Sequence, residues 1–205
     1  MSQFRNLLFK TFEPGIEILG SVYFTQGTVV DTGVVLARDF SLDTRFSCDS
    51  TFTSNYYFCG AGTNPTNSNR FFIQIRPESE LYYMILGNVI VAPSNLGPLT
   101  NKVTFHVADG NQTIVTSDGE ANFTRSYGAN LGTSTNSLVI GGFNRDSGYT
   151  TDPRQFAGEF EYLDINTAGE RYHFVGAKLS DSTIVIYDVE HDVVIYPAYG
   201  ELQEI

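Results

Sequence analysis

The sequence predicts an all-β fold, in the form of a two-sheet antiparallel sandwich or jelly roll. Short apolar or alternating runs recur along the chain with polar turn residues between them, and Val, Ile, Phe, Tyr and Thr dominate these runs. No window shows an apolar stripe with the period of 3.6 residues that a helix requires. Roughly a dozen short strands joined by polar turns are typical of a sandwich or jelly roll. The expected strands are residues 15–24, 28–36, 44–52, 56–61, 70–76, 81–91, 102–109, 112–116, 137–143, 156–165, 171–175, 183–188 and 193–196.

Two hairpins are predicted from their turns. Residues 112–116 lead through Asp118 and Gly119 into residues 120–124, and an Asp-Gly dipeptide suits a tight turn because glycine tolerates positive φ. Residues 184–187 and 193–196 flank a polar turn that begins at Asp188, whose side chain is expected to bond its own backbone.

The chain is expected to form one domain, residues 15–205, preceded by an arm, residues 1–14. A length of 205 residues suits one large sandwich, and no linker or internal repeat divides the sequence. One strand illustrates the expected alternation between core and surface: Val103, Phe105 and Val107 inward, Thr104 and His106 outward.

The composition argues against several classes of function. The net charge of −11 and the lack of a basic stripe argue against nucleic acid as a partner. No apolar run approaches the length of a membrane span, and the first residues predict no signal peptide. The three histidines are scattered, so neither a metal site nor a cofactor is expected. Cys48 and Cys59 are interpreted as two buried thiols, with a single local bridge as the alternative.

Two short motifs stand out, Asp31-Thr-Gly33 and Ile186-Tyr-Asp188. Together with several apolar segments between residues 16 and 197, they resemble motifs of laminin-G-like, concanavalin A-like domains, in the versions found in bacteriophages and gut bacteria. The resemblance covers most of residues 16–197, and its most specific parts are Asp31-Thr-Gly33 and the terminal hairpin with Ile186-Tyr-Asp188. The resemblance implies that both parts are structural turns and not active sites. Gly176 departs from the family, which often has proline there. The other matching segments are residues 21–27, 138–143, 156–158, 174–178 and 194–196.

The resemblance implies a concanavalin A-like jelly roll and, by analogy with phage proteins, a place on the virion surface as a decoration, fibre or receptor-binding component. The expected partners are other virion proteins, further copies of the chain, and a glycan of the host surface. Such a protein would be made in the host cytoplasm, which agrees with the absence of a predicted signal peptide. A purely structural protein that cements a capsid is an alternative that the sequence leaves open.

The strongest enzyme candidate is the segment that contains Glu159, Glu161 and Asp164. Laminarinase-type glycoside hydrolases share the fold and use closely spaced carboxylates on one strand. Glu159 and Glu161 are two residues apart and face the same side, whereas Asp164 would need a β-bulge to join them. The chain also has no tryptophan to serve as a sugar platform. We therefore expect no catalysis and keep the hydrolase as the alternative.

The best candidate for ligand binding is residues 144–152, which are predicted to form a long polar loop joining two apolar strands. It combines amide, guanidinium, carboxylate and aromatic side chains, the groups that recognise sugars. The expected binding residues are Asn144, Arg145, Asp146, Tyr149 and Asp152.

The arm is expected to bind a partner protein. It places large apolar residues near the N-terminus, where Arg5 and Lys10 would suit an acidic surface. The expected contact residues are Phe4, Leu7, Leu8, Phe9 and Phe12. Alternatively, the arm closes one end of its own sandwich.

Overall fold

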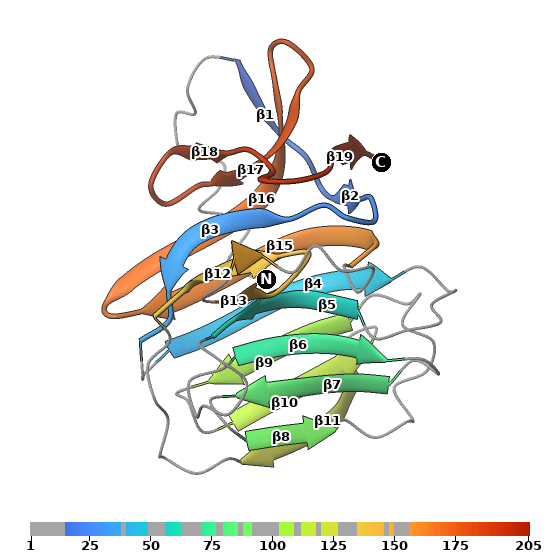
Figure 1. Cartoon of the computed structure of the whole chain (residues 1–205), viewed down its shortest axis with the longest axis vertical. Coiled ribbons are helices and arrows are strands. Elements are labelled where there is room, and N and C mark those ends of the chain that lie inside the picture. The colour runs from blue at the N-terminus through green and yellow to red at the C-terminus, as the bar shows by residue number, and fades with distance from the viewer. Residues whose placement is uncertain are drawn as a thin grey trace.

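The computed structural model describes residues 15–37, 40–48, 56–62, 71–76, 80–85, 88–91, 103–108, 112–117, 120–126, 135–145, 148–149 and 156–205. For residues 76–126 and 145–149 within these ranges it describes the backbone alone. The described chain is all-β, with strands in two sheets and without a helix, as predicted (Figure 1). A helix long and apolar enough to cross a membrane is therefore also absent from the described residues.

The larger sheet has eleven described strands, and its main path is β11-β10-β9-β4-β15-β16-β17-β18. Two short strands near the N-terminus, β1 and β2, pair with β16 and β15, and the last strand, β19, pairs with β2. Its strands are β1 (Ile16–Ile18), β2 (Val22–Phe24), β4 (Phe40–Cys48), β9 (Val103–Ala108), β10 (Gln112–Ser117), β11 (Glu120–Ser126), β15 (Gly158–Thr167), β16 (Glu170–Leu179), β17 (Ile184–Asp188), β18 (Val193–Ile195) and β19 (Leu202–Glu204).

The smaller sheet has eight described strands, with the path β14-β13-β5-β6-β7-β8 and with β12 between β3 and β5. Pairing is antiparallel throughout both described sheets, except where Asn144 of β13 meets Ala61 of β5 in parallel. Its strands are β3 (Val30–Val35), β5 (Tyr56–Ala61), β6 (Phe71–Arg76), β7 (Glu80–Ile85), β8 (Asn88–Val91), β12 (Ser137–Ile140), β13 (Asn144–Arg145) and β14 (Gly148–Tyr149).

Both predicted hairpins are confirmed, as antiparallel pairs of β10 with β11 and of β17 with β18. The sequence placed other boundaries differently: residues 15–24 form two strands, residues 81–91 form the pair β7 and β8, and β4 begins at Phe40 rather than at residue 44. The strand expected at 137–143 ends at Ile140, because Gly141 has a φ of +84° and lies where a Cβ would overlap the backbone of Thr28.

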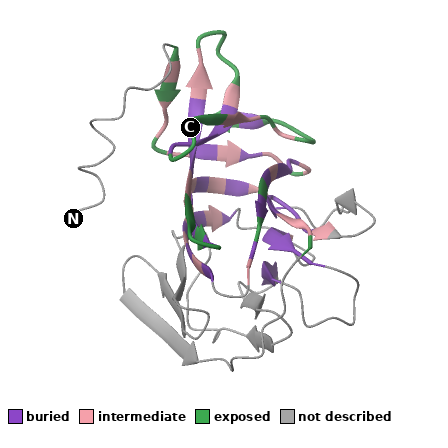
Figure 2. Ribbon diagram, turned by 90° about the vertical axis from the view of Figure 1, so that its left-hand side faces the viewer, coloured by how far each residue is buried: buried purple, intermediate pink, exposed green. Residues whose placement is uncertain are grey.

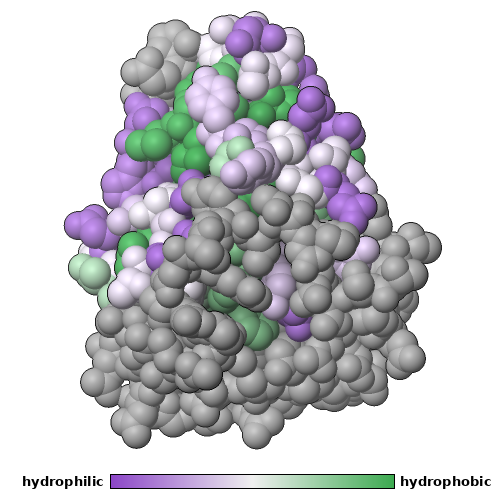
Figure 3. Space-filling view, viewed as in Figure 1, coloured by the Kyte–Doolittle hydropathy of each residue, from purple (hydrophilic) through white to green (hydrophobic). Residues whose placement is uncertain are grey.

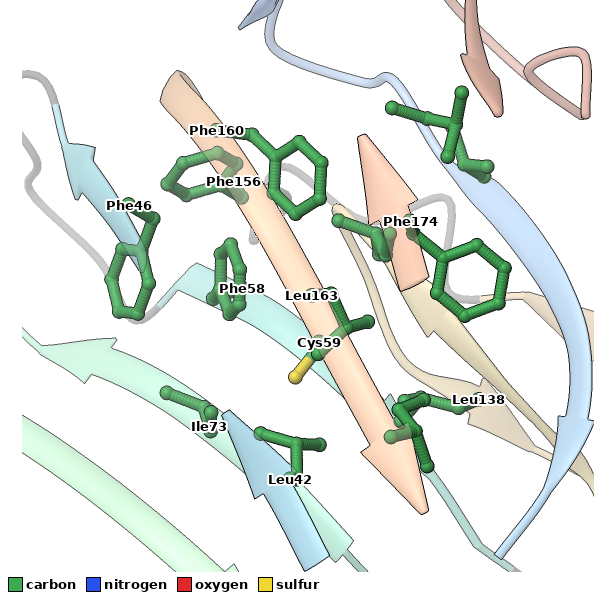
Figure 4. Close-up of a cluster of buried hydrophobic side chains, with 14 of the residues drawn as sticks. Leu42, Phe46, Phe58, Cys59, Ile73, Leu138, Phe156, Phe160, Leu163 and Phe174 are labelled. Carbon is green, nitrogen blue, oxygen red and sulfur yellow. The ribbon is translucent and has the colours of Figure 1, made fainter. Parts of the chain in front are cut away.

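The core lies between the two sheets and is rich in phenylalanine (Figure 4). Phe46 of β4 stacks on Phe58 of β5, with ring centroids 3.9 Å apart, and Phe40 of β4 meets Phe71 of β6 edge-on at 5.4 Å, so ring pairs connect the two sheets. Phe156 meets both rings edge-on, at 6.0 Å from Phe46 and 5.1 Å from Phe58. Edge-to-face and offset-stacked pairs each stabilise by roughly 0.5–1.5 kcal/mol beyond the area that they bury.

Side chains alternate between core and surface along the strands, as a β-sandwich requires (Figure 2). In β4 every second residue, from Phe40 to Cys48, is buried, and the residues between them are partly exposed. The alternation predicted for residues 103–107 concerns side chains outside the described part of the structure.

Cys48 and Cys59 are buried free thiols, as interpreted from the sequence. Both belong to the main core cluster, where they fill space beside the phenylalanine rings. Their role in the described structure is therefore the packing of small apolar side chains.

Gly176 of β16 provides a test of this packing. A Cβ at Gly176 would overlap the buried side chain of Val22 in β2, whereas a Cβ at Gly20 meets nothing within 4 Å. We expect Gly176→Ala to lower the free energy of unfolding by about 1–3 kcal/mol, because the buried valine cannot move aside. Gly20→Ala should change it by less than about 0.5 kcal/mol. Urea denaturation of both variants measures the difference, and equal stabilities would contradict the contact.

Candidate binding face

A β-bulge in β15 decides which side chains share the outer face of the larger sheet. Phe160 pairs with Phe46 and Tyr162 with Arg45, so Glu161 is an extra residue in β15. The hydroxyl of Thr44 donates a hydrogen bond of 2.6 Å to the carbonyl oxygen of Tyr162. This part-buried bond holds the irregular backbone in place.

The bulge brings Glu159, Glu161 and Asp164 to the same face, because the strand gains one residue between Phe160 and Leu163. Both of these apolar residues remain in the core, while the three acidic residues are partly exposed. The sequence indicated that Asp164 would need a bulge to join the other two carboxylates, and the structure contains one.

Six side chains from three neighbouring strands form three bonded pairs that lie side by side on this outer face, which we call the binding face. Arg45 Nη1 lies 3.3 Å from Glu161 Oε2, and the Tyr162 hydroxyl donates to Asp43 Oδ1 at 3.1 Å. The binding face consists of Asp43 and Arg45 of β4, Glu161, Tyr162 and Asp164 of β15, and His173 of β16; Asp164 and His173 are bonded through Oδ1 and Nδ1.

His173 is fixed from a second side by the turn between β17 and β18. Its backbone N–H donates to Asp188 Oδ1 at 3.2 Å, and the same oxygen accepts the N–H of Glu190 at 3.1 Å. His191 Nδ1 lies 2.7 Å from the other carboxylate oxygen. The bond to Glu190 confirms the prediction that Asp188 bonds the backbone of its own turn, and the binding face is thereby anchored to the next hairpin.

The described bonds of His173 do not form a nucleophile–His–Asp triad. In a nucleophile–His–Asp triad the second ring nitrogen of the histidine takes the proton of the nucleophile. His173 Nε2 is buried and has no hydrogen-bond partner among the described residues. The two carboxylates Glu161 and Asp164 are already bound by Arg45 and His173. No three described His, Cys, Asp or Glu side chains gather into a group that could hold a metal ion.

Tyr162 is the aromatic member of the binding face. Burial raises the pKa of its hydroxyl above the usual 10.0, and the negative charge of Asp43 and the bond to it raise the pKa further. The neutral, hydrogen-bonded phenol is therefore the form that the folded protein stabilises.

Among the ligand-binding residues predicted from sequence, Asn144 has a structural role. Its amide donates to the carbonyl oxygen of Ser137 at 3.0 Å and lies 3.1 Å from the Ser137 hydroxyl. Arg145 and Tyr149 belong to the paired strands β13 and β14, which form a small hairpin rather than a long loop. The other two predicted residues, Asp146 and Asp152, lie outside the described residues, as do Phe4, Leu7, Leu8, Phe9 and Phe12 of the arm.

Asp31-Thr-Gly33, which the sequence predicted to be a structural turn, lies instead within strand β3. Asp31 Oδ1 accepts the N–H of Gly33 at 2.9 Å, and Gly33 has a φ of +71°. The hydroxyl of Thr32 donates to the carbonyl oxygen of Leu138 in β12 at 2.7 Å. The triplet thus shapes an irregular edge strand.

Sequence reasoning missed Asp43, Arg45, Tyr162 and His173 as members of one site. The available signal was the strict alternation of β4, which places residues 43 and 45 on one face. No sequence signal identifies which strand lies beside β4.

Comparison with solved structures relates this fold to domains of sialidases. The chain is similar to the carbohydrate-binding domain CBM40 of the Ruminococcus gnavus IT-sialidase, with 13% identity and a TM-score of 0.54 over 73% of this chain and 90% of that one. The same domain has been solved with α2,3-sialyllactose bound, at 12% identity and a TM-score of 0.53 over 73% and 89% of the two chains. NanB sialidase from Streptococcus pneumoniae matches 95% of this chain at 12% identity and a TM-score of 0.53, but only 39% of its own length is covered.

At these identities the likeness shows the fold, which is the two-sheet sandwich of known carbohydrate-binding domains. No known protein family matches the sequence, and no curated protein matches it.

Because the pKa of Tyr162 is raised in the folded protein, the free energy of unfolding should change with pH in the alkaline range. The contribution of the neutral phenol is fully present below about pH 10, the unfolded pKa, and is lost as the pH rises toward the folded pKa. At neutral pH, Tyr162→Phe should lower the free energy of unfolding by about 1 kcal/mol, the usual contribution of one hydrogen bond. Above pH 10 its stability should fall less steeply than that of the wild type.

Urea denaturation across alkaline pH measures this difference, and Tyr196→Phe, at an exposed tyrosine, is the control. Parallel pH profiles for wild type and Tyr162→Phe would contradict the assignment.

Proposed function

We propose that this protein is a non-catalytic carbohydrate-binding protein whose ligand lies on the binding face. The observation that carries the proposal is the group formed by Asp43, Arg45, Glu161 and Asp164 beside the ring of Tyr162. Fixed polar groups next to an aromatic surface suit the alternating hydroxyls and C–H faces of a sugar. The likeness to a domain solved with sialyllactose supports a glycan as the ligand.

The internal bonds of the binding face suit recognition better than catalysis. Arg45, Tyr162 and His173 each hold a carboxylate in one orientation before a ligand arrives, which lowers the entropy cost of binding. A glycoside hydrolase would need two carboxylates placed for proton transfer and attack. Laminarinase-type hydrolysis is the alternative proposal. It would use the carboxylates of Glu159, Glu161 and Asp164.

We further propose that the domain works on the surface of a bacteriophage virion, held by its N-terminal arm to other virion proteins or to further copies of itself. The sequence resemblance and the apolar arm support this setting. The described surface offers apolar contacts to a neighbour, since Val193, Tyr196 and Ile205 are 46%, 59% and 68% exposed. In Figure 3 apolar surface gathers in the upper part of the molecule, where Figure 1 places β17 and β18. A purely structural, capsid-cementing protein is the alternative.

Glycan binding by the binding face can be tested with alanine variants. We expect Arg45→Ala and Tyr162→Ala to weaken binding on a glycan array and in calorimetry by about tenfold or more, because each removes a direct contact. Lys178→Ala is the matched control, since Lys178 is also ion-paired with a glutamate but lies off the binding face.

If the ligand instead binds at the site predicted from the sequence, residues 144–152, the alanine variants should show the opposite pattern of binding losses. If Arg145→Ala and Tyr149→Ala abolish binding while the Arg45 and Tyr162 variants bind normally, the ligand lies at β13 and β14. Hydrolysis of a bound glycan that Glu159→Gln abolishes would favour the hydrolase.

The role of the arm can be tested by deleting residues 1–13. We expect the truncated chain to lose self-association or incorporation into particles while its melting temperature stays nearly unchanged, because the arm contacts a partner. Sedimentation and thermal unfolding measure the two properties. A large fall in the melting temperature of the isolated chain would show instead that the arm completes its own domain.

A further inference from the structure

The cations of the described structure are already paired with carboxylates. Arg45 lies 3.3 Å from Glu161, Arg171 lies 3.8 Å from Glu190, and Lys178 lies 2.8 Å from Glu204. Together these are the lysine and arginine side chains that the structure describes. Among them, an anionic ligand would find no cation without a carboxylate partner.

The binding face itself carries more negative than positive groups. Among the described side chains, Asp43, Glu161 and Asp164 lie beside one arginine, and Glu159 follows on the same side of β15. The whole chain has a net charge of −11, so distant charges add to the negative potential rather than offset it.

Carboxylates distinguish neutral from acidic sugars by simple chemistry. A carboxylate oxygen accepts hydrogen bonds, and each hydroxyl of a neutral sugar can donate one. The carboxylate of sialic acid has no proton to donate and is repelled by like charges at short range. To bind here it would have to compete with Glu161 for the Arg45 guanidinium.

We propose that the binding face takes a neutral, hydroxyl-rich glycan and excludes sialylated ones, with the Arg45–Glu161 pair as the element that sets this specificity. The inference rests on the proposed function and adds the class of ligand to it. Glu161 occupies the guanidinium that an acidic sugar would need, while the remaining carboxylates accept sugar hydroxyls. The ligand class therefore differs from the sialyllactose bound by the structurally similar CBM40 domain.

The test compares glycans that differ only in one sialic acid. The full chain is applied to an array of neutral oligosaccharides and their α2,3- and α2,6-sialylated forms, with lactose and the two sialyllactoses as one such set. We expect each sialylated form to bind at least about tenfold more weakly than its neutral parent. Affinity for the neutral glycan that binds best should change by less than about twofold between about 0.05 M and about 0.5 M salt, since no net charge pair forms.

Glu161→Gln tests the specificity element directly. It frees the Arg45 guanidinium and removes one negative charge, so it should raise binding of the sialylated forms by about tenfold relative to their neutral parents. Glu204→Gln makes the same chemical change at the Lys178 pair, away from the binding face, and should leave that ratio unchanged. A folded Glu161→Gln variant with an unaltered ratio overturns the specificity role.

The remaining outcomes separate this inference from the function on which it rests. If the wild-type protein binds sialylated glycans more tightly than neutral ones, the inferred specificity is wrong, but the proposal of carbohydrate binding stands. Binding of no glycan on the array overturns the proposed function and the inference together.

Discussion

The contact between Phe46 and Phe58 is the constraint on which the arrangement of both sheets depends. It joins β4, at the centre of the larger sheet, to β5 in the smaller one, and Phe156 closes against both rings. Because the inner face of β4 packs against the core in this way, its alternate residues Asp43 and Arg45 must point outward. The packing of the core therefore sets the position of the polar groups on the opposite side of the same strand.

The bulge in β15 turns this scaffold into a site. A regular strand with Phe160 in the core would place Leu163 outside and Asp164 inside, since one residue of offset exchanges the two faces of a strand. The extra residue at Glu161 allows Phe160 and Leu163 both to reach the core while Glu159, Glu161 and Asp164 share the outside. Thr44 makes this possible at small energetic cost, because its hydroxyl satisfies the carbonyl of Tyr162.

Local features of the fold could be predicted from the sequence, and non-local ones could not. The hairpins of β10 with β11 and of β17 with β18 have short-range signals, an Asp-Gly dipeptide in one and Asp188 in the other. The early start of β4 was missed because polar Thr44 occupies an inward position and interrupts its apolar pattern. The pairings of Asp43 with Tyr162 and of Asp164 with His173 depend on strand order and on the bulge, for which the sequence carries no local signal.

The buried thiol of Cys59 has a further consequence for how the molecule can be observed. It is fully enclosed in the core, and this burial raises the thiol pKa well above its usual 9.0. Alkylating reagents react with the exposed thiolate and therefore cannot modify Cys59 while the two sheets are closed. The rate at which Cys59 becomes labelled would report how often the sandwich opens, without any dye or isotope. The same enclosure makes the core indifferent to the redox state of its surroundings as long as the protein remains folded.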